Sequence, residues 1–144
     1  MRGKPLVGVT TSHGMRHDVI ERILATQPID VVQISYSPVD REIERRILPM
    51  AREKGVAVIV NRPFREGALI DAVMQHKLPD FARAIDCANW AQFLLKFAVS
   101  HPAVTCAIPA TSRVDHLAEN MGAGLGRMPD AAMRERMAGH VQGL

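Results

Sequence analysis

Four short apolar runs recur along the chain, at residues 6–9, 31–34, 56–60 and 104–108, and apolar residues at helical spacing follow each of them. Short runs without a polar face are typical of buried parallel strands. The alternation of strands and helices predicts an α/β fold in which a four-stranded parallel sheet is covered on at least one side. Right-handed crossovers between these strands would form either an open sheet or part of a barrel.

The segment between the second and third strands predicts where one helix is interrupted and where it ends. Ile43, Ile47 and Leu48 share one helical face, and Pro49 interrupts it. Because a proline inside a helix costs about 3 kcal/mol, we expect a kink or a break near Leu48. Gly55 then stands where glycine commonly ends a helix.

The connection between the third and fourth strands is long, with a short helical pattern at 69–74 and a longer one at 90–98. No stretch rich in Ser, Gly and Pro separates two patterned regions, so no domain boundary is indicated. We expect one structural unit over residues 1–144, with a terminal helix from about residue 129 whose Met133, Met137 and Val141 pack against the rest.

Polar residues follow the fourth strand in a pattern that suits a phosphate. The loop and the next helix carry Thr111, Ser112, Arg113, His116, Glu119 and Asn120. Unpaired backbone amides and the positive dipole end at a helix start attract phosphate, and two hydroxyls and a guanidinium stand beside them. Simple capping of this helix by a hydroxyl residue, with Arg113 in solvent, is the alternative.

Polar side chains also stand at or near the ends of the first three strands. These are Thr10, Thr11, Gln33 and Asn61. Since parallel barrels and open α/β sheets bind ligands at the carboxyl ends of their strands, these side chains could meet a bound molecule. A buried carboxamide without a partner costs several kcal/mol. Gln33 therefore contacts either such a ligand or a neighbouring core group.

Taken together, the segments from residue 6 to about residue 122 resemble the second half of the aldo/keto reductase barrel. Gly8-Val9-Thr10-Thr11 stands where the fifth strand of that family ends in Gly-Val-Ser-Asn, and Gln33 matches the glutamine of its sixth strand. The eighth unit of the family has Ile-Pro, a hydroxyl residue, and then Glu and Asn along the helix. The matching residues here are Ile108, Pro109, Thr111, Glu119 and Asn120.

The chain also departs from the family pattern. Asn61 stands where many members place an aromatic ring, Ala110 replaces Gly or Lys, and His116 stands where Arg or Gln is frequent. The resemblance implies that the chain binds NADP(H). In the family, residues at the positions of Thr10, Thr11 and Gln33 hold the nicotinamide carboxamide, and the loop after the eighth strand holds the adenosine phosphate.

The length and the missing motifs together predict half a barrel. A (β/α)8 barrel takes about 250 residues, and this chain has 144. We expect a partial TIM barrel, a half-barrel of four β-α units that corresponds to strands five to eight. The catalytic Asp, Tyr, Lys and His of the family lie on the first four strand ends and have no counterpart in the matched region. No catalytic residue is assigned.

The one tyrosine does not replace the missing acid in this interpretation. Tyr36 follows the predicted strand that contains Gln33, in a Tyr-Ser-Pro sequence, and is predicted to be a structural loop residue. Activation of a tyrosine by lysine requires the lysine at a strand end. None of the four lysines is predicted there: Lys4, Lys54, Lys77 and Lys96.

The composition limits which binding partners and which cellular compartment we expect for this protein. The net charge is +3, and cations alternate with acids, as in residues 41–46, which favours a solvated helix face over a nucleic-acid patch. No run of eighteen apolar residues and no signal peptide after Met1 indicate a membrane or an export route, so we expect a cytoplasmic protein. Cys87 and Cys106 are expected to be core thiols, not a disulfide or a metal site.

The expected function is that of the NADP(H)-binding half of an aldo/keto reductase, inactive by itself. Its expected partners are the nicotinamide cofactor and either a second copy or a complementary N-terminal half. A non-catalytic nucleotide-binding or self-associating module is the alternative, and the substrate is not indicated. Half a barrel leaves two open strand edges and an apolar inner face, here expected from Val7, Val9, Val32, Ile34, Val58, Val60 and the neighbours of Cys106.

Overall fold

In the computed structural model, which describes residues 5–11 and 13–144, four parallel strands form one sheet in the order β1-β2-β3-β4. They are β1 (Gly8–Thr10), β2 (Val31–Ser35), β3 (Ala57–Asn61) and β4 (Cys106–Ala107). All four predicted strands are present, although β4 is shorter than the predicted 104–108. The α/β fold with parallel strands is therefore confirmed.

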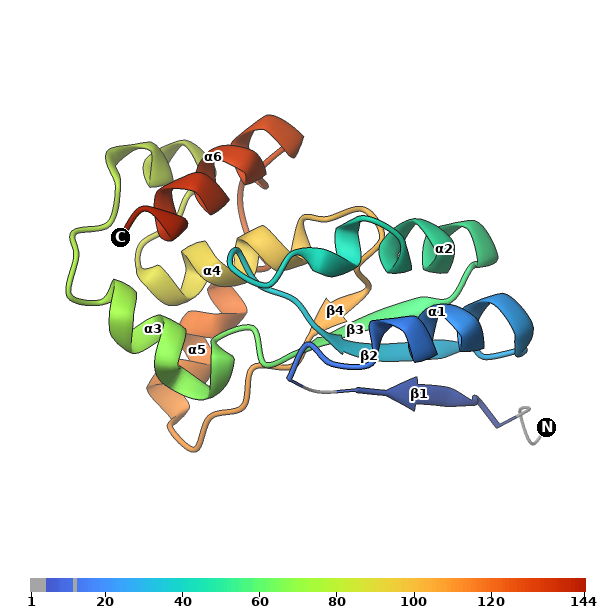
Figure 1. Cartoon of the computed structure of the whole chain (residues 1–144). Coiled ribbons are helices and arrows are strands. Elements are labelled where there is room, and N and C mark those ends of the chain that lie inside the picture. Colours follow the sequence, from blue (N-terminus) through green and yellow to red (C-terminus); the bar gives the residue numbers. More distant parts are fainter. Residues whose placement is uncertain (1–4, 12) are drawn as a thin grey trace.

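Helices follow the strands as the hydrophobic pattern predicts. They are α1 (His17–Thr26), α2 (Ile47–Lys54), α3 (Ala68–Val73), α4 (Trp90–Val99), α5 (Val114–Gly122) and α6 (Ala131–Gln142). Short 3-10 turns, η1 (Glu42–Glu44), η2 (Arg65–Gly67) and η3 (Asp80–Ile85), complete the connections. Figure 1 shows α1 and α2 over one face of the sheet, with α3 and α5 beyond the carboxyl ends of the strands.

The predicted interruption near Leu48 is present, but it comes two residues earlier. Ile43 lies in η1, and Arg46, with φ −138° and ψ −47°, separates this turn from α2. Pro49 is the third residue of α2, where the missing N–H would have had no partner within the helix. Gly55 ends α2 in the left-handed conformation, with φ 67°, as predicted.

The two faces of the sheet differ in burial. Val32 pairs with Val58, and Ile34 pairs with Val60, and all four are fully buried in the core that the helices cover. The alternate residues Gln33 and Ile59 and the β4 residue Cys106 share the opposite face, which is only partly covered.

The predicted composition of the inner face is thus wrong. Val9, Val32, Ile34, Val58 and Val60 pack towards the helices, and Val7 is exposed ahead of β1. An all-apolar strand gives no alternation from which the two faces could be told apart.

The two cysteines also differ from one another in burial. Cys87 is buried as expected, and burial raises the pKa of its thiol to about 11. Cys106 is exposed, so its prediction as a core residue is wrong.

The chain ends in α6, close to the predicted start at residue 129. The Asp130 carboxylate caps this helix by accepting a hydrogen bond from the Met133 backbone N–H at 2.8 Å. Met137 and Val141 are buried and Met133 is half-buried, as expected. None of the helices in residues 5–11 and 13–144 combines the length with the apolar character that crossing a bilayer requires.

Candidate functional site

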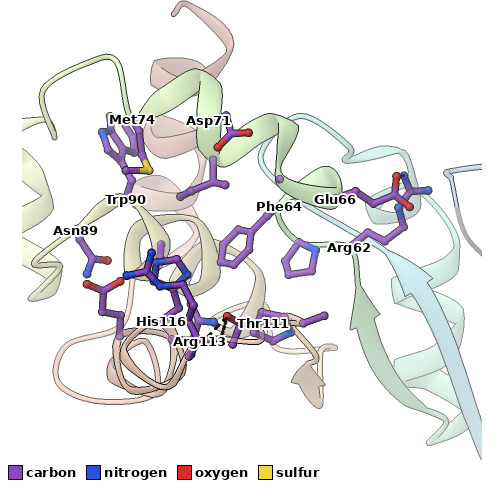
Figure 2. A pocket seen from close by; sticks show the side chains of 18 of the residues that line it. Arg62, Phe64, Glu66, Asp71, Met74, Asn89, Trp90, Thr111, Arg113 and His116 are labelled. Carbon is purple, nitrogen blue, oxygen red and sulfur yellow. Dashed lines mark hydrogen bonds and ion pairs between the residues drawn. The ribbon is translucent and has the colours of Figure 1, made fainter.

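A cleft of about 1160 Å³ lies beyond the carboxyl ends of β3 and β4, between α3 and α5 (Figure 2). Its walls come from the loop after β3, from α3, from the start of α4, from the loop after β4 and from α5. Pockets for small ligands measure about 300–1,000 Å³. This cleft is therefore large enough for a ligand of dinucleotide size.

One end of the cleft is lined by apolar side chains. Figure 2 shows Trp90 and Met74 together there, with Phe64 nearer to Thr111. The indole Nε1–H of Trp90 donates a hydrogen bond to the His76 carbonyl at 2.9 Å, which fixes the orientation of the ring. This wall offers flat apolar surfaces to a ligand that has a ring system of its own.

The wall formed by α5 carries most of the predicted phosphate-site residues. Six of the ten predicted site residues line the cleft: Asn61, Thr111, Arg113, His116, Glu119 and Asn120. The Thr111 hydroxyl accepts a hydrogen bond from the Arg113 N–H at 3.1 Å, and Arg113, the N-cap residue of α5, makes no side-chain cap. Thr111 thus closes the turn ahead of the helix without capping it.

Arg113 is already paired with an acid of its own helix. Its guanidinium Nε donates to Asp115 Oδ1 at 3.1 Å, and this hydrogen bond holds the pKa of Asp115 below its usual range. Both side chains are more than half exposed. Because exposed ion pairs contribute little, an anionic ligand can compete with Asp115 for Arg113.

The other four predicted site residues lie outside the walls of this cleft. The Thr11 hydroxyl donates to the Met15 carbonyl at 2.9 Å, and Thr10 and Thr11 border a smaller hollow beside α1. Gln33 is half-buried on the open face of the sheet, so it does not need a core partner. Ser112 is exposed.

Asn61 connects these two groups of residues. Its side chain is 7% exposed; the amide nitrogen donates to the Thr11 carbonyl at 2.9 Å, and the amide oxygen accepts from the Ser35 hydroxyl at 2.7 Å. Through these two hydrogen bonds Asn61 links the ends of β1, β2 and β3 at the edge of the cleft.

Sequence reasoning missed Arg62. Its Nη2 lies 3.0 Å from the Glu66 carboxylate, while Nε and Nη1 are buried without a hydrogen-bond partner in the described structure. Arg62, Arg65 and Glu66 all have a positive φ, between 50° and 59°, which is a costly conformation for such residues. The signal was available in the sequence, because a cation directly follows β3 at the edge where ligands bind.

In the part of the chain that the structure describes, Tyr36 and the lysines considered as its activators do not line this cleft. Tyr36 is fully buried, and its hydroxyl donates a hydrogen bond to the Glu44 carboxylate. Burial, more than this bond, raises the pKa of Tyr36 well above its usual range. Lys96 is buried on α4, and Lys4 lies outside the described residues. Within the described residues, no three His, Cys, Asp or Glu side chains come together as metal ligands.

Comparison with known proteins gives the same family for nearly the whole chain. The family model described as "Aldo/keto reductase family" matches residues 6–136. The "Aldo-keto reductase yakc [NADP(+)]" of Schizosaccharomyces pombe is 26% identical over 148 aligned positions, which cover 82% of this chain and 44% of that protein. The "NADH-specific methylglyoxal reductase" of Escherichia coli is 34% identical over 67 residues, 46% of this chain and 21% of that protein.

Solved structures show the same architecture. The aldo-keto reductase AKR11C1 from Bacillus halodurans, in its holo form, superposes with a TM-score of 0.70 at 20% identity, over 94% of this chain and 49% of that chain. The apo form gives a TM-score of 0.69. The present chain thus spans less than half the length of the curated relatives it matches, and its fold is consistent with part of a barrel.

Proposed function

Because the chain belongs to the aldo/keto reductase family, we propose that it is the NADP(H)-binding half of such a reductase, equivalent to strands five to eight of the barrel and forming one unit over residues 1–144. The observation that carries this proposal is the cleft between α3 and α5, where six of the predicted cofactor residues come together. A cytoplasmic location is part of the proposal.

In this assignment the cofactor lies along the carboxyl ends of the strands. The adenosine phosphate occupies the start of α5, where Thr111 and Arg113 line the cleft and Ser112 stands beside them. The nicotinamide carboxamide lies towards Thr10, Thr11 and Gln33. Asn61, bonded to the Thr11 carbonyl, joins these two regions and supports a continuous path between them.

The middle of the dinucleotide would then cross the loop after β3. Arg62 lines the cleft there, and two of its guanidinium nitrogens have no partner in the described structure. Its pair with Glu66 can be exchanged, since Glu66 is 65% exposed. Arg62 is therefore suited to the diphosphate, which carries negative charge at the middle of the molecule.

Preference for NADP(H) over NAD(H) is proposed from the cations of the α5 wall. The additional phosphate of NADP(H) needs charged donors, and Arg113 stands at the helix start where a phosphate is favoured. The relatives differ in this respect: the Schizosaccharomyces pombe protein is named for NADP(+), and the Escherichia coli protein is named as NADH-specific. The preference of this chain must therefore be measured.

Binding can be followed through the one tryptophan of the chain, because Trp90 lines the cleft. Titration of the protein with NADPH should quench its fluorescence at lower concentrations than titration with NADH. A charged hydrogen bond contributes about 1.5–3 kcal/mol, so the expected preference is about tenfold or more. The double variant Thr111→Ala, Arg113→Ala should lose most of this preference.

Arg22→Ala serves as the matched control, because Arg22 is an exposed arginine of α1 that does not line the cleft. This variant should keep the preference for NADPH. Equal dissociation constants for NADPH and NADH in the unmodified protein would refute the assignment of the phosphate site.

The alternative function is a non-catalytic module that binds a nucleotide or associates with itself. It is favoured by the absence, among the described residues, of a lysine-activated tyrosine at a strand end. In either case the proposed partner is a second copy or a complementary N-terminal half. Turnover by this chain alone is the measurement that bears on the catalytic set.

A further inference from the structure

Acidic side chains outnumber arginines on the walls of the cleft. Besides His76 and His116, the described lining residues with a titratable or charged side chain are four acids and two arginines: Glu66, Asp71, Asp115, Glu119, Arg62 and Arg113. Like charges repel one another, so these acids oppose the binding of a nucleotide with several negative charges. The two arginines are the cationic groups at which its phosphates are favoured.

Each of these arginines is paired with an acid that is close to it in the sequence (Figure 2). Arg113 Nε donates to Asp115 Oδ1 at 3.1 Å, and Arg113 Nη2 donates to Asp115 Oδ2. Arg62 Nη2 lies 3.0 Å from Glu66 Oε2. A guanidinium binds a phosphate through two parallel N–H groups in the same way as it binds a carboxylate. A phosphate that binds this edge of Arg113 must therefore displace the Asp115 carboxylate.

The two pairs differ in how much of the guanidinium the acid uses. Asp115 takes two nitrogens of Arg113, whereas the ion pair of Glu66 is made to one nitrogen of Arg62, and Arg62 Nε and Nη1 have no hydrogen-bond partner in the described structure. The side chains of Asp115 and Glu66 are 59% and 65% exposed. Because exposed ion pairs are weak, both acids can release their arginine to a ligand.

Asp115 also takes the place of an anion at the start of α5. It lies in the first turn of this helix, where the dipole favours negative charge. The hydrogen bond from Arg113, and to a smaller extent the backbone N–H of His116, hold the pKa of Asp115 below its usual range. Asp115 therefore stays ionised at neutral pH and uses the same two features, the guanidinium and the helix start, that suit a phosphate.

Resting on the nucleotide site of the proposed function, we propose that two acids of the cleft compete with the nucleotide for its arginines. Asp115 occupies Arg113, which is assigned to the phosphate that NADPH has and NADH lacks. Asp115 therefore limits the preference for NADPH over NADH. Glu66 occupies Arg62, which is assigned to the diphosphate that both nucleotides share. Glu66 therefore limits the affinity for both nucleotides to the same extent.

The experiment replaces each acid by its neutral isostere in the full chain and titrates the Trp90 fluorescence with NADPH and NADH. Asp115→Asn should lower the dissociation constant for NADPH about fivefold, the upper end of what an exposed ion pair contributes, and leave that for NADH within twofold. Glu66→Gln should lower both constants about threefold and leave their ratio within twofold. Each variant removes one carboxylate from the same cleft, so each is a control for the other.

Two further variants separate competition for Arg113 from a general effect of charge. Asp71 is an acid of the α3 wall, and Figure 2 shows it across the cleft from Arg113. Asp71→Asn should therefore leave the ratio of the two dissociation constants within twofold. In the Arg113→Ala background, Asp115→Asn should not change the ratio either, because the group for which Asp115 competes is absent.

The outcomes distinguish this inference from the proposed function. An unchanged ratio in Asp115→Asn, in a protein that still prefers NADPH, would overturn the competition at Arg113 and leave the proposed function intact. A rise in the ratio that Asp71→Asn reproduces, or that persists without Arg113, would overturn it as well. Glu66→Gln binding that improves for only one nucleotide, or for neither, would overturn the role of Glu66. An unmodified protein that binds neither nucleotide would refute the proposed function itself, and this inference with it.

Discussion

At the scale of single residues, the charge of Lys96 stabilises the fold and is not part of the candidate site. Its ammonium group is fully buried and donates to the carbonyls of Ile85, Leu125 and Arg127 at 2.7, 2.6 and 2.9 Å. These three carbonyls belong to η3 and to the segment after α5. Lys96 therefore holds the segment after α5 against α4 and η3.

Replacement of this lysine by methionine keeps the apolar stem and removes the donor. Lys96→Met should lower the free energy of unfolding by about 2–4 kcal/mol, because three buried carbonyls lose their partner. Urea denaturation followed by circular dichroism measures the change. Lys77→Met is the control: its side chain is 85% exposed, so its urea midpoint should not move, and equal midpoints for both variants would contradict the structural role of Lys96.

Single residues were also the hardest features to predict from the sequence. Lys96 follows the helical pattern of α4 and gives no sign of burial, because its carbonyl partners come from distant segments. The position of Arg62 directly after β3 could have indicated a site residue, but the burial of its guanidinium and the positive φ of its backbone could not be predicted. Thr111 and Arg113 could be predicted, since a loop between a strand and a helix places them at the helix start.

At the scale of elements, α5 is held against the body of the molecule through a narrow contact. Gln92 Nε2 on α4 donates to the Glu119 carbonyl at 3.2 Å, and Gln92 Oε1 accepts from the Ala88 N–H at 2.9 Å. A Cβ added at Gly122 would lie 2.4 Å from Gln92 Nε2 and 3.2 Å from its Cδ. Gly122 thus leaves room for the Gln92 amide, which would have to shift if a Cβ were added.

This contact predicts a coupling between Gln92 and Gly122 in nucleotide binding. Gly122→Ala should displace the Gln92 side chain, shift the α5 wall and raise the dissociation constant for NADPH about fivefold, the equivalent of one hydrogen bond. Gln92→Ala should weaken binding to a similar extent. Adding Gly122→Ala to Gln92→Ala should change nothing further, because the clash is gone. Additive effects of the two substitutions in the fluorescence titration would contradict the coupling.

Elements were predicted well where a hydrophobic pattern was specific and poorly where it was not. Residues at helical spacing located α1, α4 and α6, and the apolar runs located all four strands. The same runs could not reveal which face of the sheet the helices cover, since Val32 and Gln33 occupy alternate faces of one strand. The predicted extent of β4 was longer than the two residues that have ladder partners in β3, although the backbone N–H groups of Thr105 and Ile108 still donate to Val58 and Val60.

At the scale of the whole molecule, the fold places a cleft at the carboxyl ends of β3 and β4. The fold could be predicted because strand spacing and helix order are properties of the whole pattern. The sequence also led us to expect no catalytic set in the matched region, where Tyr36 is the one tyrosine, and this expectation stays a prediction. The separation of Thr10 and Thr11 from the main cleft could not be predicted, because it depends on where α1 and the loop after β1 come to lie.

The surroundings of Tyr36 argue against a role as the acid in carbonyl reduction. A general acid must lie within hydrogen-bond reach of the carbonyl and have a pKa near the working pH. Tyr36 is fully buried, its hydroxyl is bonded to Glu44, and burial raises its pKa away from that range. The ammonium of Lys96 is bonded to three backbone carbonyls, so it does not lower that pKa.

We therefore expect the chain alone to bind NADPH without oxidising it. With methylglyoxal or 4-nitrobenzaldehyde present, the absorbance of NADPH at its nicotinamide band should fall no faster than in buffer, and Tyr36→Phe should leave this background rate unchanged. Quenching of Trp90 in the same sample shows that the cofactor site is occupied, so a missing reaction cannot be attributed to an empty site. Turnover that disappears in Tyr36→Phe would mean that the chain has built a proton donor from its own residues.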